Sequence, residues 1–333
     1  ENYTYYPGFN TKAFIEDCTS NSVKTIEKYK NKLILLISHS HVGGAPVALV
    51  EMMKWLKHRG FETRLLMPEH SEKYASWNPI LYFDDKYLLN TLVKHMDPCL
   101  VIANSWSSGF KNLVQFPNVM WWSHEFKVHY ADWHLDKIKC LHTVCDRIGK
   151  EYSEEAVSTK SIPPFRVDWS YLDTCSTKEN EMSKKLRAMG QTKYVMCGAK
   201  KDQRKNFSLF SKMARNNPAH VFVWIGSDAT RESGNLIEIE YTKNPFMYMA
   251  ACDSFLLTST LDPCPYVVLE SLYLNLNVYV TRDNIGYNHG PMVNLYDPDK
   301  STRLPRKKDR NMKGKQYILT NFTSPQSTEF LNL

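Results

Sequence analysis

The residues best placed to do chemistry lie in the stretch LDPCPYVVLE (261–270), which carries two carboxylates, Asp262 and Glu270, around two prolines. An ionised carboxylate accepts hydrogen bonds at both oxygens, so it can bind neighbouring hydroxyl pairs such as those of sugars and ribose. Pro265 suits the first position of a helix, because it lacks the amide hydrogen that would be unpaired there. The amides that are then free to face an anion are those of Tyr266, Val267 and Val268. The stretch therefore predicts a site for a ligand with both phosphate and hydroxyl groups, such as a nucleotide-sugar.

Two cations occupy the equivalent position of an earlier strand-to-helix turn, CGAKKDQRKN (197–206). Gly198 ends the predicted strand, and Arg204 and Lys205 precede a helix that is predicted to begin near Asn206. Arginine offers a planar fork of donors and lysine a point charge, which together suit a diphosphate. A single lysine more often lies on a solvated surface, but the position at the carboxyl end of a strand favours a ligand here.

Turns in the first half of the chain carry a glycine pair and a histidine. Gly43 and Gly44, in SHSHVGGAPV (38–47), let the backbone approach a ligand closely, and the helix that follows favours an anion at its N-terminus. The alternative is a tight turn alone. His124 follows the apolar strand of WWSHEF (121–126), where a neutral imidazole could hydrogen-bond a sugar or phosphate oxygen. The alternative there is a histidine bonded to the local backbone.

An alternation of apolar strands and amphipathic helices begins at residue 33. Strands that are apolar throughout and alternate with helices indicate parallel sheets covered on both faces. The predicted strands span 33–38, 61–67, 99–104, 118–123 and 138–145, and then 193–198, 220–226, 236–240, 253–259 and 277–281. The predicted helices span 47–60, 86–96, 206–216 and 244–251. The last of these helices is expected to begin with Asn244 as its cap and Pro245 in its first turn.

This pattern predicts an α/β chain of two Rossmann-like, doubly wound domains in tandem, facing each other across a cleft. A ligand would lie in that cleft, at the carboxyl ends of the strands. The predicted divisions are an N-terminal extension (1–30), an N-terminal Rossmann-like domain (31–160), a linker (161–190), a C-terminal Rossmann-like domain (191–300) and a C-terminal tail (301–333).

Composition argues against several classes of protein. The 333 residues are 43% hydrophobic and 23% charged, as in soluble globular proteins, and no apolar run approaches the ~20 residues of a membrane span. The net charge of +7 is mild, and the basic run RLPRKKDR (303–310) is interpreted as a solvated tail, not as a nucleic-acid surface. The eight cysteines form no CxxC pair, which predicts reduced cysteines in a cytoplasmic protein instead of a disulfide framework or zinc site.

Several motifs between residues 33 and 290 resemble, in the same order, those of the family-4 retaining glycosyltransferases, which have the GT-B architecture. That family's turn SHxxxxGAP and strand end WWxHE are matched by SHSHVGGAP and WWSHEF. Its C-terminal half reads GxxxxxRKG, FVWIG, NPxxYMAxxD and DPFPLVVLEA. The corresponding stretches here are GAKKDQRKN, FVWIG, NPFMYMAACD and DPCPYVVLES.

The resemblance implies a role for each matching residue. His124 would contact the donor sugar, and Arg204 and Lys205 would neutralise the departing diphosphate. Asp262 and Glu270 would stand at the two acids of the family's E-x7-E motif and bind the sugar hydroxyls and the ribose, respectively. The remaining donor-binding positions would be Gly43, Gly44, Gly198, Tyr266, Val267 and Val268.

Three positions depart from the family's pattern. Leu261 replaces an acid that is common just before the aspartate, Asn206 replaces the loop glycine, and NIGYN (284–288) replaces a glycine-rich turn. These departures bear on the choice of donor sugar more than on the type of reaction.

The implied activity is retaining transfer of a sugar from a UDP- or GDP-sugar to a hydroxyl group of a glycan, glycoprotein or lipid-linked acceptor. No metal or cofactor is expected, because the two cations and a helix end supply the positive charge. The alternatives are a weak or inactive nucleotide-sugar-binding module, an epimerase or phosphorylase of similar shape, and a dinucleotide oxidoreductase, against which the missing GxGxxG argues. Basic patches on the N-terminal half leave a peripheral membrane contact open.

Overall fold

The computed structural model describes residues 33–41, 43–83, 85–125, 138, 140–153, 159–197, 201, 203–281, 285–299, 303–306 and 309–326. The described residues form two compact units. Unit 1 consists of those up to Thr143 together with Glu151–Lys160, and unit 2 consists of Val144–Lys150 and Ser161–Gln326. The predicted N-terminal extension lies outside the described residues.

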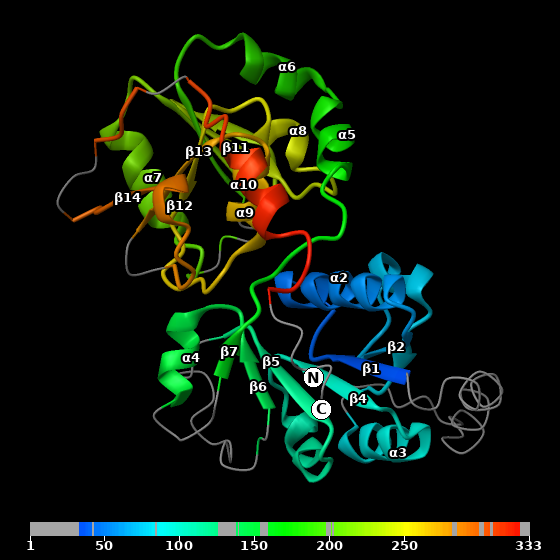
Figure 1. Ribbon diagram of the computed structural model, residues 1–333. Helices are drawn as coiled ribbons and strands as arrows, with labels where there is room; N and C mark the ends of the chain where they lie inside the picture. The colour runs from blue at the N-terminus through cyan, green and yellow to red at the C-terminus, as the bar shows by residue number, and fades with distance from the viewer. Residues whose placement is uncertain are drawn as a thin grey trace. The chain divides into compact units, whose positions relative to one another are not determined.

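Unit 1 is built on a seven-stranded sheet in the order β3-β2-β1-β4-β5-β6-β7, and the pairings from β3 to β6 are parallel. The strands are β1 (Leu33–Ser38), β2 (Glu62–Met67), β3 (Ile80–Leu81), β4 (Leu100–Asn104), β5 (Val119–Ser123), β6 (Cys140–Thr143) and β7 (Thr159–Ser161). The helices are α2 (Gly44–His58), η1 (Glu72–Trp77), α3 (Lys86–Met96), η2 (Ser108–Gln115) and α4 (Asp146–Ser153), within which the two units divide. Figure 1 shows α2 and α3 on opposite sides of this sheet.

Unit 2 carries a second seven-stranded sheet, in the order β10-β11-β9-β8-β12-β13-β14, which is parallel except for the edge pair β10–β11. Its strands are β8 (Lys193–Cys197), β9 (Val221–Ser227), β10 (Arg231–Ser233), β11 (Leu236–Glu240), β12 (Ser254–Leu257), β13 (Asn277–Thr281) and β14 (Val293–Tyr296). Its helices are α5 (Tyr171–Thr177), α6 (Glu181–Ala188), α7 (Phe207–Asn216), α8 (Phe246–Met249), α9 (Tyr266–Tyr273), η5 (Gly290–Met292) and α10 (Gly314–Asn321). The strands run between α7 on one side and α5, α6 and α8 on the other (Figure 1).

Both sheets have the strand order of a Rossmann fold. Apart from the edge strand β10, the order β11-β9-β8-β12-β13-β14 repeats in unit 2 the order of the first six strands of unit 1. Successive strands are therefore added in one direction across the sheet from β1 to β3 in unit 1 and from β8 to β11 in unit 2, and in the opposite direction from β4 and β12. The place between β1 and β4, and between β8 and β12, is the topological switch point of each sheet, called its reversal point below. Ligands of such sheets bind outside the carboxyl ends of the strands at this reversal. The predicted α/β class, with two doubly wound Rossmann-like domains, is confirmed.

Most of the predicted elements form where the apolar pattern places them, and two helix starts differ. Gly60 follows α2 with a φ of 84°, as the predicted glycine stop requires. The predicted helix 244–251 is wrong in length, because α8 has only four residues, and Pro245 is its cap. Asn244 does not cap it: its side-chain amide donates instead to the carbonyl of Cys175 on α5, 3.0 Å away. Pro265 likewise precedes α9 as its N-cap, with an extended ψ of 129°.

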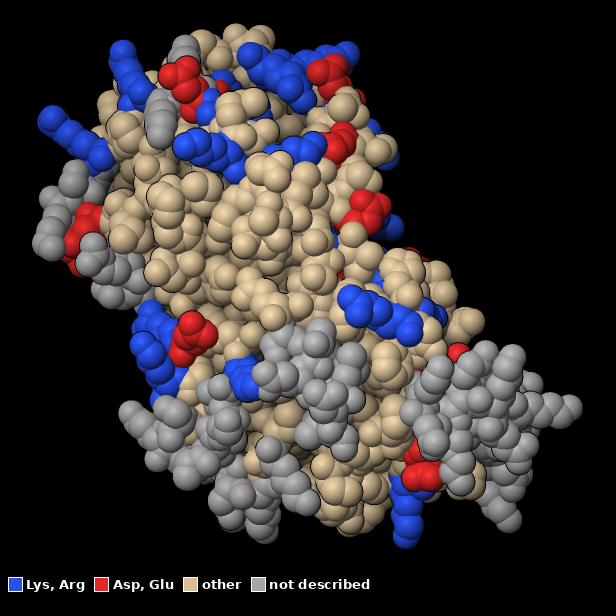
Figure 2. Space-filling view, in the orientation of Figure 1, with Lys and Arg blue, Asp and Glu red and all other residues tan. Residues whose placement is uncertain are grey.

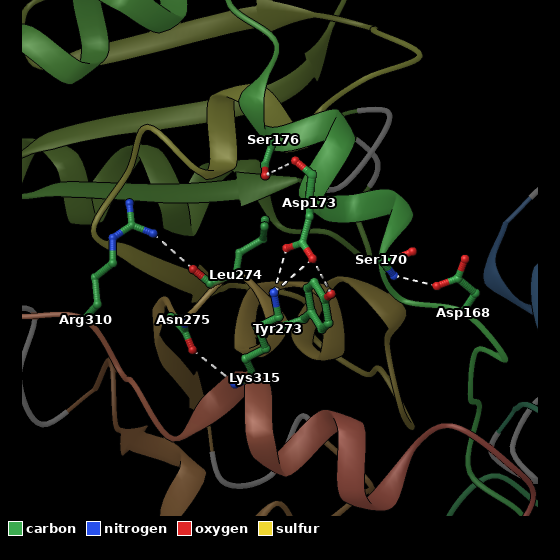
Figure 3. Close-up of polar contacts among 9 residues, drawn as sticks. All are labelled: Asp168, Ser170, Asp173, Ser176, Tyr273, Leu274, Asn275, Arg310 and Lys315. Carbon is green, nitrogen blue, oxygen red and sulfur yellow. Dashed lines mark hydrogen bonds and ion pairs between the residues drawn. The ribbon is translucent and has the colours of Figure 1, made fainter.

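The segments interpreted as linker and tail contribute ordered structure to unit 2. Residues 161–190 contain α5 and α6, and α10 packs on α9. The interpretation of 303–310 as a solvated tail is wrong for Leu304, which is buried. Arg310 is exposed, as expected of such a segment, but its side chain is bonded to the rest of unit 2. The Arg310 guanidinium donates to the carbonyls of Leu274, Ala250 and Cys252 at 3.0, 2.6 and 3.3 Å, and Figure 3 draws the first of these bonds. Leu274 is the C-cap of α9, Ala250 is the C-cap of α8, and Cys252 lies just beyond α8. Arg310 therefore stabilises the C-terminal ends of both helices.

On the face seen in Figure 2, the described Lys and Arg side chains lie in small groups, several with an Asp or Glu side chain beside them. Within the part of the chain that the structure describes, none of the helices combines the length and hydrophobicity of a membrane-spanning segment. No disulfide bond joins the seven described cysteines to one another; Cys145, Cys252 and Cys264 among them are buried, and Cys18 lies outside the described residues.

Candidate functional site

The reversal point of the unit 2 sheet brings together one predicted cation and one predicted acid. Lys205 comes from the turn after β8, and Asp262 comes from the turn after β12. The Lys205 Nζ donates to Asp262 Oδ2 at 2.6 Å, and the two side chains are only 13% and 10% exposed. Both residues were predicted to lie at this edge of the sheet, but their pairing was not predicted.

The two turns also bond to each other through their backbones. The Thr260 amide donates to the Arg204 carbonyl at 2.8 Å, and the Thr258 hydroxyl donates to the Lys205 carbonyl at 3.0 Å. Asn206 then begins α7 with a φ of 55°, and its side chain accepts from the Leu209 amide at 3.1 Å. A left-handed position is one that glycine or asparagine adopts readily, which accounts for asparagine at a position where the family pattern has glycine.

Arg204 differs from Lys205 in its surroundings. Its side chain is exposed, and its guanidinium forms no ion pair or hydrogen bond with the described residues. An exposed guanidinium at the carboxyl edge of a parallel sheet can offer its whole fork of donors to an anionic ligand. Gly198, the glycine predicted to end β8, lies outside the described residues.

The second predicted acid, Glu270, lies inside α9 and pairs with Arg166, a residue that was not predicted to belong to the site. Arg166 Nη2 donates to Glu270 Oε1 at 2.5 Å, and both side chains are 11% exposed. Burial disfavours the charged guanidinium, but the Glu270 carboxylate and nearby Tyr171 and Tyr266 together raise the pKa of Arg166 above its ordinary value. Glu270 therefore accepts from a cation that remains charged.

The two acids share one arrangement. Asp262 and Glu270 each commit one carboxylate oxygen to a buried cation. The other oxygens, Asp262 Oδ1 and Glu270 Oε2, make no hydrogen bond with the described residues. Neither of these two oxygens is fully buried, so both remain accessible to a ligand. Each acid can thus accept hydrogen bonds from hydroxyl groups of a ligand while its negative charge stays compensated.

The beginning of α9 offers fewer free amides than predicted. No side chain caps this helix, and its first turn contains no acidic residue, so the positive end of the helix dipole meets no protein anion there. The Val268 amide, however, donates to the Pro265 carbonyl at 3.0 Å. The expectation that this amide is free is wrong, because the turn that starts the helix uses it. Tyr266 and Val267 remain the predicted anion-binding positions.

In unit 1, three adjacent strands end in a polar cluster that contains His124. The His39 Nδ1 lies 3.1 Å from the Asn104 carbonyl oxygen, and since a carbonyl only accepts, this nitrogen carries the proton in the neutral ring. Burial lowers the pKa of His39, and burial together with His39 lowers the pKa of His124 to about 3. The buried atoms His124 Nε2 and Asn104 Oδ1 have no hydrogen-bond partner among the described residues. The neutral imidazole of His124 and the amide oxygen of Asn104 thus each have an unused hydrogen-bonding atom, which a hydroxyl group of a ligand can pair with.

The remaining predicted residues of unit 1 form the start of α2. Gly43 caps this helix with a φ of 94°, which a residue with a side chain rarely adopts, and Gly44 is its first residue. Both glycines are exposed, and the first turn of α2 has no acidic residue. Beside His124, Glu125 accepts from the Ser105 hydroxyl, and Ser105 has a φ of 65°. His39, Asn104 and Ser105 were missed, although two of them lie directly beside strands that were predicted.

Comparison with solved structures supports the architecture. A glycosyltransferase from Rickettsia africae is similar to this chain with a TM-score of 0.63 and 12% identity, over 89% of this chain and 95% of the other. HepE from Anabaena, solved in complex with UDP-glucose, gives 0.60 and 13%, over 86% and 89%. A putative UDP-N-acetylglucosamine 2-epimerase from Listeria monocytogenes gives 0.50 and 11%, over 76% and 79%.

These comparisons show the fold of the chain. The neighbours include GT-B glycosyltransferases, and the two Rossmann-like sheets agree with that architecture, so the chain has the GT-B fold. No family model and no curated relative matches the sequence. Because the same fold also occurs in the epimerase, the reaction has to be argued from the site.

Proposed function

We propose that the protein is a retaining glycosyltransferase, similar to family 4, that transfers a sugar from a nucleoside-diphosphate donor to a hydroxyl group of an acceptor. The donor would be a UDP- or GDP-sugar, and the acceptor a glycan, a glycoprotein or a lipid-linked molecule. UDP is the first nucleotide to test, because HepE was solved with UDP-glucose.

One observation carries the proposal: two buried acids at the reversal point of the unit 2 sheet each present one uncommitted oxygen. Asp262 would accept from hydroxyl groups of the donor sugar, and Glu270 would accept from the ribose. Their charge is already compensated by Lys205 and Arg166 at 2.6 and 2.5 Å, so a diphosphate need not approach an unscreened carboxylate.

The diphosphate would bind between Arg204, Lys205 and the start of α9. An ammonium group has three hydrogens, so Lys205 can keep its bond to Asp262 and still donate to a phosphate oxygen. Arg204 is exposed and uncommitted, and the Tyr266 and Val267 amides lie at a helix N-terminus without an acidic neighbour. These groups supply positive charge, and the proposal therefore requires no metal ion.

His124 would hydrogen-bond a hydroxyl group of the donor sugar through its unpartnered Nε2. Its pKa of about 3 keeps the ring neutral at physiological pH, so it would serve as a polar contact and not as a cation. Gly43 and Gly44 would let the α2 backbone approach the ligand closely.

In this mechanism the bond between the sugar carbon C1 and the diphosphate oxygen breaks, and a bond from C1 to the acceptor oxygen forms on the same face. The acceptor proton goes to the departing diphosphate, so no protein side chain becomes covalently attached. The protein contributes positioning and stabilisation of the developing phosphate charge. Each fixed donor of this kind typically contributes about 3 kcal/mol to lowering the barrier.

Two measurements test the proposal. Isothermal titration calorimetry with UDP and GDP, with and without EDTA, should show binding that does not depend on a divalent metal. Proton NMR of an incubation with α-linked UDP- and GDP-sugars and a panel of acceptors should show a product with the α-anomeric coupling constant. A β-linked product would overturn retention, binding without turnover would assign a non-catalytic binding module, and an altered free sugar would assign an epimerase. No binding of either nucleotide would overturn the proposal as a whole.

A further inference from the structure

Arg166 lies outside every motif of the sequence, yet the structure holds its guanidinium firmly in place. The guanidinium carbon lies 4.6 Å from the ring centre of Tyr266, 5.0 Å from that of Tyr171 and 5.6 Å from that of Trp169. Cation–π contacts of this kind are strongest where the cation is shielded from water, and the Arg166 side chain is 11% exposed. Three rings and one carboxylate thus restrict the orientation of the side chain.

The backbone around Arg166 is fixed as well. The Arg166 amide and the Trp169 indole nitrogen both donate to the carbonyl of Phe322, each at 2.9 Å. The Tyr266 hydroxyl donates to the Phe165 carbonyl at 2.8 Å, which ties the first residue of α9 to the residue before Arg166. The segment 165–169 is therefore bonded both to α9 and to the end of α10.

The far end of α9 is held by the same part of the chain. Tyr273 donates from its hydroxyl group to Asp173 Oδ2 at 2.9 Å, and Lys315 on α10 pairs with Asp173 at 2.8 Å (Figure 3). This second ion pair is much more exposed than the first, at 36% and 51% of its two side chains. It supports the same helix without contacting either predicted acid, so Lys315 offers a control for Arg166.

We propose that Arg166 is a positioning residue of the donor site, which holds Glu270 by one oxygen so that Oε2 accepts from the ribose hydroxyl groups of the nucleotide. The inference rests on the proposed function, because it assumes that a nucleotide binds at Glu270. A neutral side chain at position 166 leaves the Glu270 carboxylate free to rotate and without a cation. Recognition of the ribose should then weaken, whereas contacts to the diphosphate should persist.

A merely structural role has a different signature. Replacing a buried ion pair can leave stability unchanged or even raise it, and removing one partner alone lowers stability. Neither effect distinguishes a ribose with its 2′-hydroxyl from one without it. The preference for UDP over 2′-deoxy-UDP therefore reports on the position of Glu270 separately from the stability of the fold.

The experiment measures the Kd of UDP and of 2′-deoxy-UDP by calorimetry for the wild-type protein and four variants. A hydrogen bond to a charged group corresponds to roughly a tenfold to hundredfold preference for UDP in the wild type. We expect this preference to fall below about threefold in Arg166→Gln and in Glu270→Gln, and to fall no further in the double variant. Lys315→Gln should keep the wild-type preference. If Arg166→Gln does not fold, Arg166→Lys, which keeps the charge but loses the planar fork, should show an intermediate preference.

The outcomes separate the two proposals. If UDP does not bind the wild-type protein, the proposed function fails and the role of Arg166 fails with it. If UDP binds with a clear preference over 2′-deoxy-UDP, and Arg166→Gln or Arg166→Lys keeps that full preference, the role of Arg166 is overturned while the proposed function stands. An equal loss of preference in Lys315→Gln would also overturn it, because the effect would then come from general loosening of α9.

Discussion

Lys205 and Asp262 form a buried ion pair that links the two strands at the reversal point of the unit 2 sheet, with 2.6 Å between Nζ and Oδ2. Unit 2 contains another lysine pair of the same length, Lys185 with Glu232 at 2.6 Å, but those side chains are 48% and 43% exposed. Because the two ion pairs have the same length and differ in burial, comparing them shows how much burial changes the contribution of an ion pair to stability. The buried pair combines two predicted site residues, so its loss should affect stability as well as chemistry.

The first prediction concerns the stability of unit 2. Lys205→Ala leaves the Asp262 carboxylate buried without its cation, and removal of one partner of a buried pair costs about 3–5 kcal/mol. Lys185→Ala should cost less than about 1 kcal/mol, because exposed ion pairs contribute little. Urea unfolding followed by tryptophan fluorescence measures both values. Equal losses in the two variants would show that burial of the Lys205 pair has no energetic consequence.

The second prediction separates the two cations by function. Arg204 is exposed and has no partner among the described residues, so Arg204→Ala should leave the midpoint of unfolding unchanged. Loss of a donor to the departing diphosphate should lower kcat by about a hundredfold or more in Arg204→Ala and also in Lys205→Ala. Turnover of the donor, measured by nucleotide release, checks this. A variant of either residue that keeps near-normal turnover would remove that residue from the proposed mechanism.

Features of the fold and the site that depend on neighbouring residues could be predicted from the sequence, whereas contacts between residues far apart in the chain could not. Apolar runs located the strands, and the strand ends placed Lys205, Asp262 and His124 at the correct edges of their sheets, because parallel strands align their carboxyl ends. The pairing of Arg166 with Glu270 was not predictable, since it joins residues 104 positions apart and Arg166 follows two prolines in a stretch without periodicity. The start of α8 was wrong for a similar reason: a tertiary bond to Cys175 took the side chain that local capping would use.

The third prediction concerns Asn206, which stands where the similar motif has glycine and which adopts a left-handed backbone conformation. Asn206 has a φ of 55°, and its side chain caps α7 by accepting from the Leu209 amide. Asn206→Ala loses the cap and puts in the left-handed region a residue that adopts it less readily than asparagine does, which together cost about 2 kcal/mol. Asn206→Gly introduces the residue that the similar glycosyltransferase motif carries at this position, and it should cost only a few tenths of a kcal/mol. Thermal unfolding of both variants checks the order, and an alanine variant as stable as the glycine variant would contradict it.

The fourth prediction concerns acid stability and His289, which packs among Tyr287, Tyr317 and Phe322 in unit 2. Burial lowers its pKa to about 3, against about 6.5 in an unfolded chain. Between pH 6.5 and pH 3 the unfolded state binds more protons at His289 than the folded state does. The free energy of unfolding is therefore not reduced by this group above about pH 6.5, and it decreases as the pH falls toward 3. Between pH 7.5 and pH 5.5 the loss from this one group is about 1.4 kcal/mol.

Replacing His289 with a side chain that does not titrate isolates this contribution. His289→Gln should flatten the decrease in unfolding free energy between pH 7.5 and pH 5.5 by about 1.4 kcal/mol, whatever its effect on stability at pH 7.5. The exposed His58→Gln is the control and should keep the wild-type slope. An unchanged slope in His289→Gln would show that this imidazole is not held neutral in the folded state.

The fifth prediction concerns Gly286, which packs against the turn that carries Asp262. A Cβ at position 286 would lie 2.6 Å from Cys145 Sγ and 2.8 Å from the Pro263 carbonyl oxygen, so one of them must move. The Gly286 amide also donates to the Asp262 and Pro263 carbonyls, at 3.3 and 2.9 Å. Gly286→Ala should therefore cost about 1–3 kcal/mol and weaken UDP binding, because it displaces the backbone beside Asp262.

The space around the new methyl group allows a rescue experiment. Cys145→Ala removes the contact at Sγ but not the one at the Pro263 carbonyl, so the double variant Cys145→Ala/Gly286→Ala should recover part of the UDP affinity that Gly286→Ala loses. Gly190→Ala is the control, because nothing lies within 4 Å of its Cβ position. If Gly286→Ala binds UDP as tightly as Gly190→Ala does, the position of the Asp262 turn does not limit donor binding. The acid would then owe its geometry to the Lys205 pair and to the bonds between the two turns, and not to the packing of Gly286.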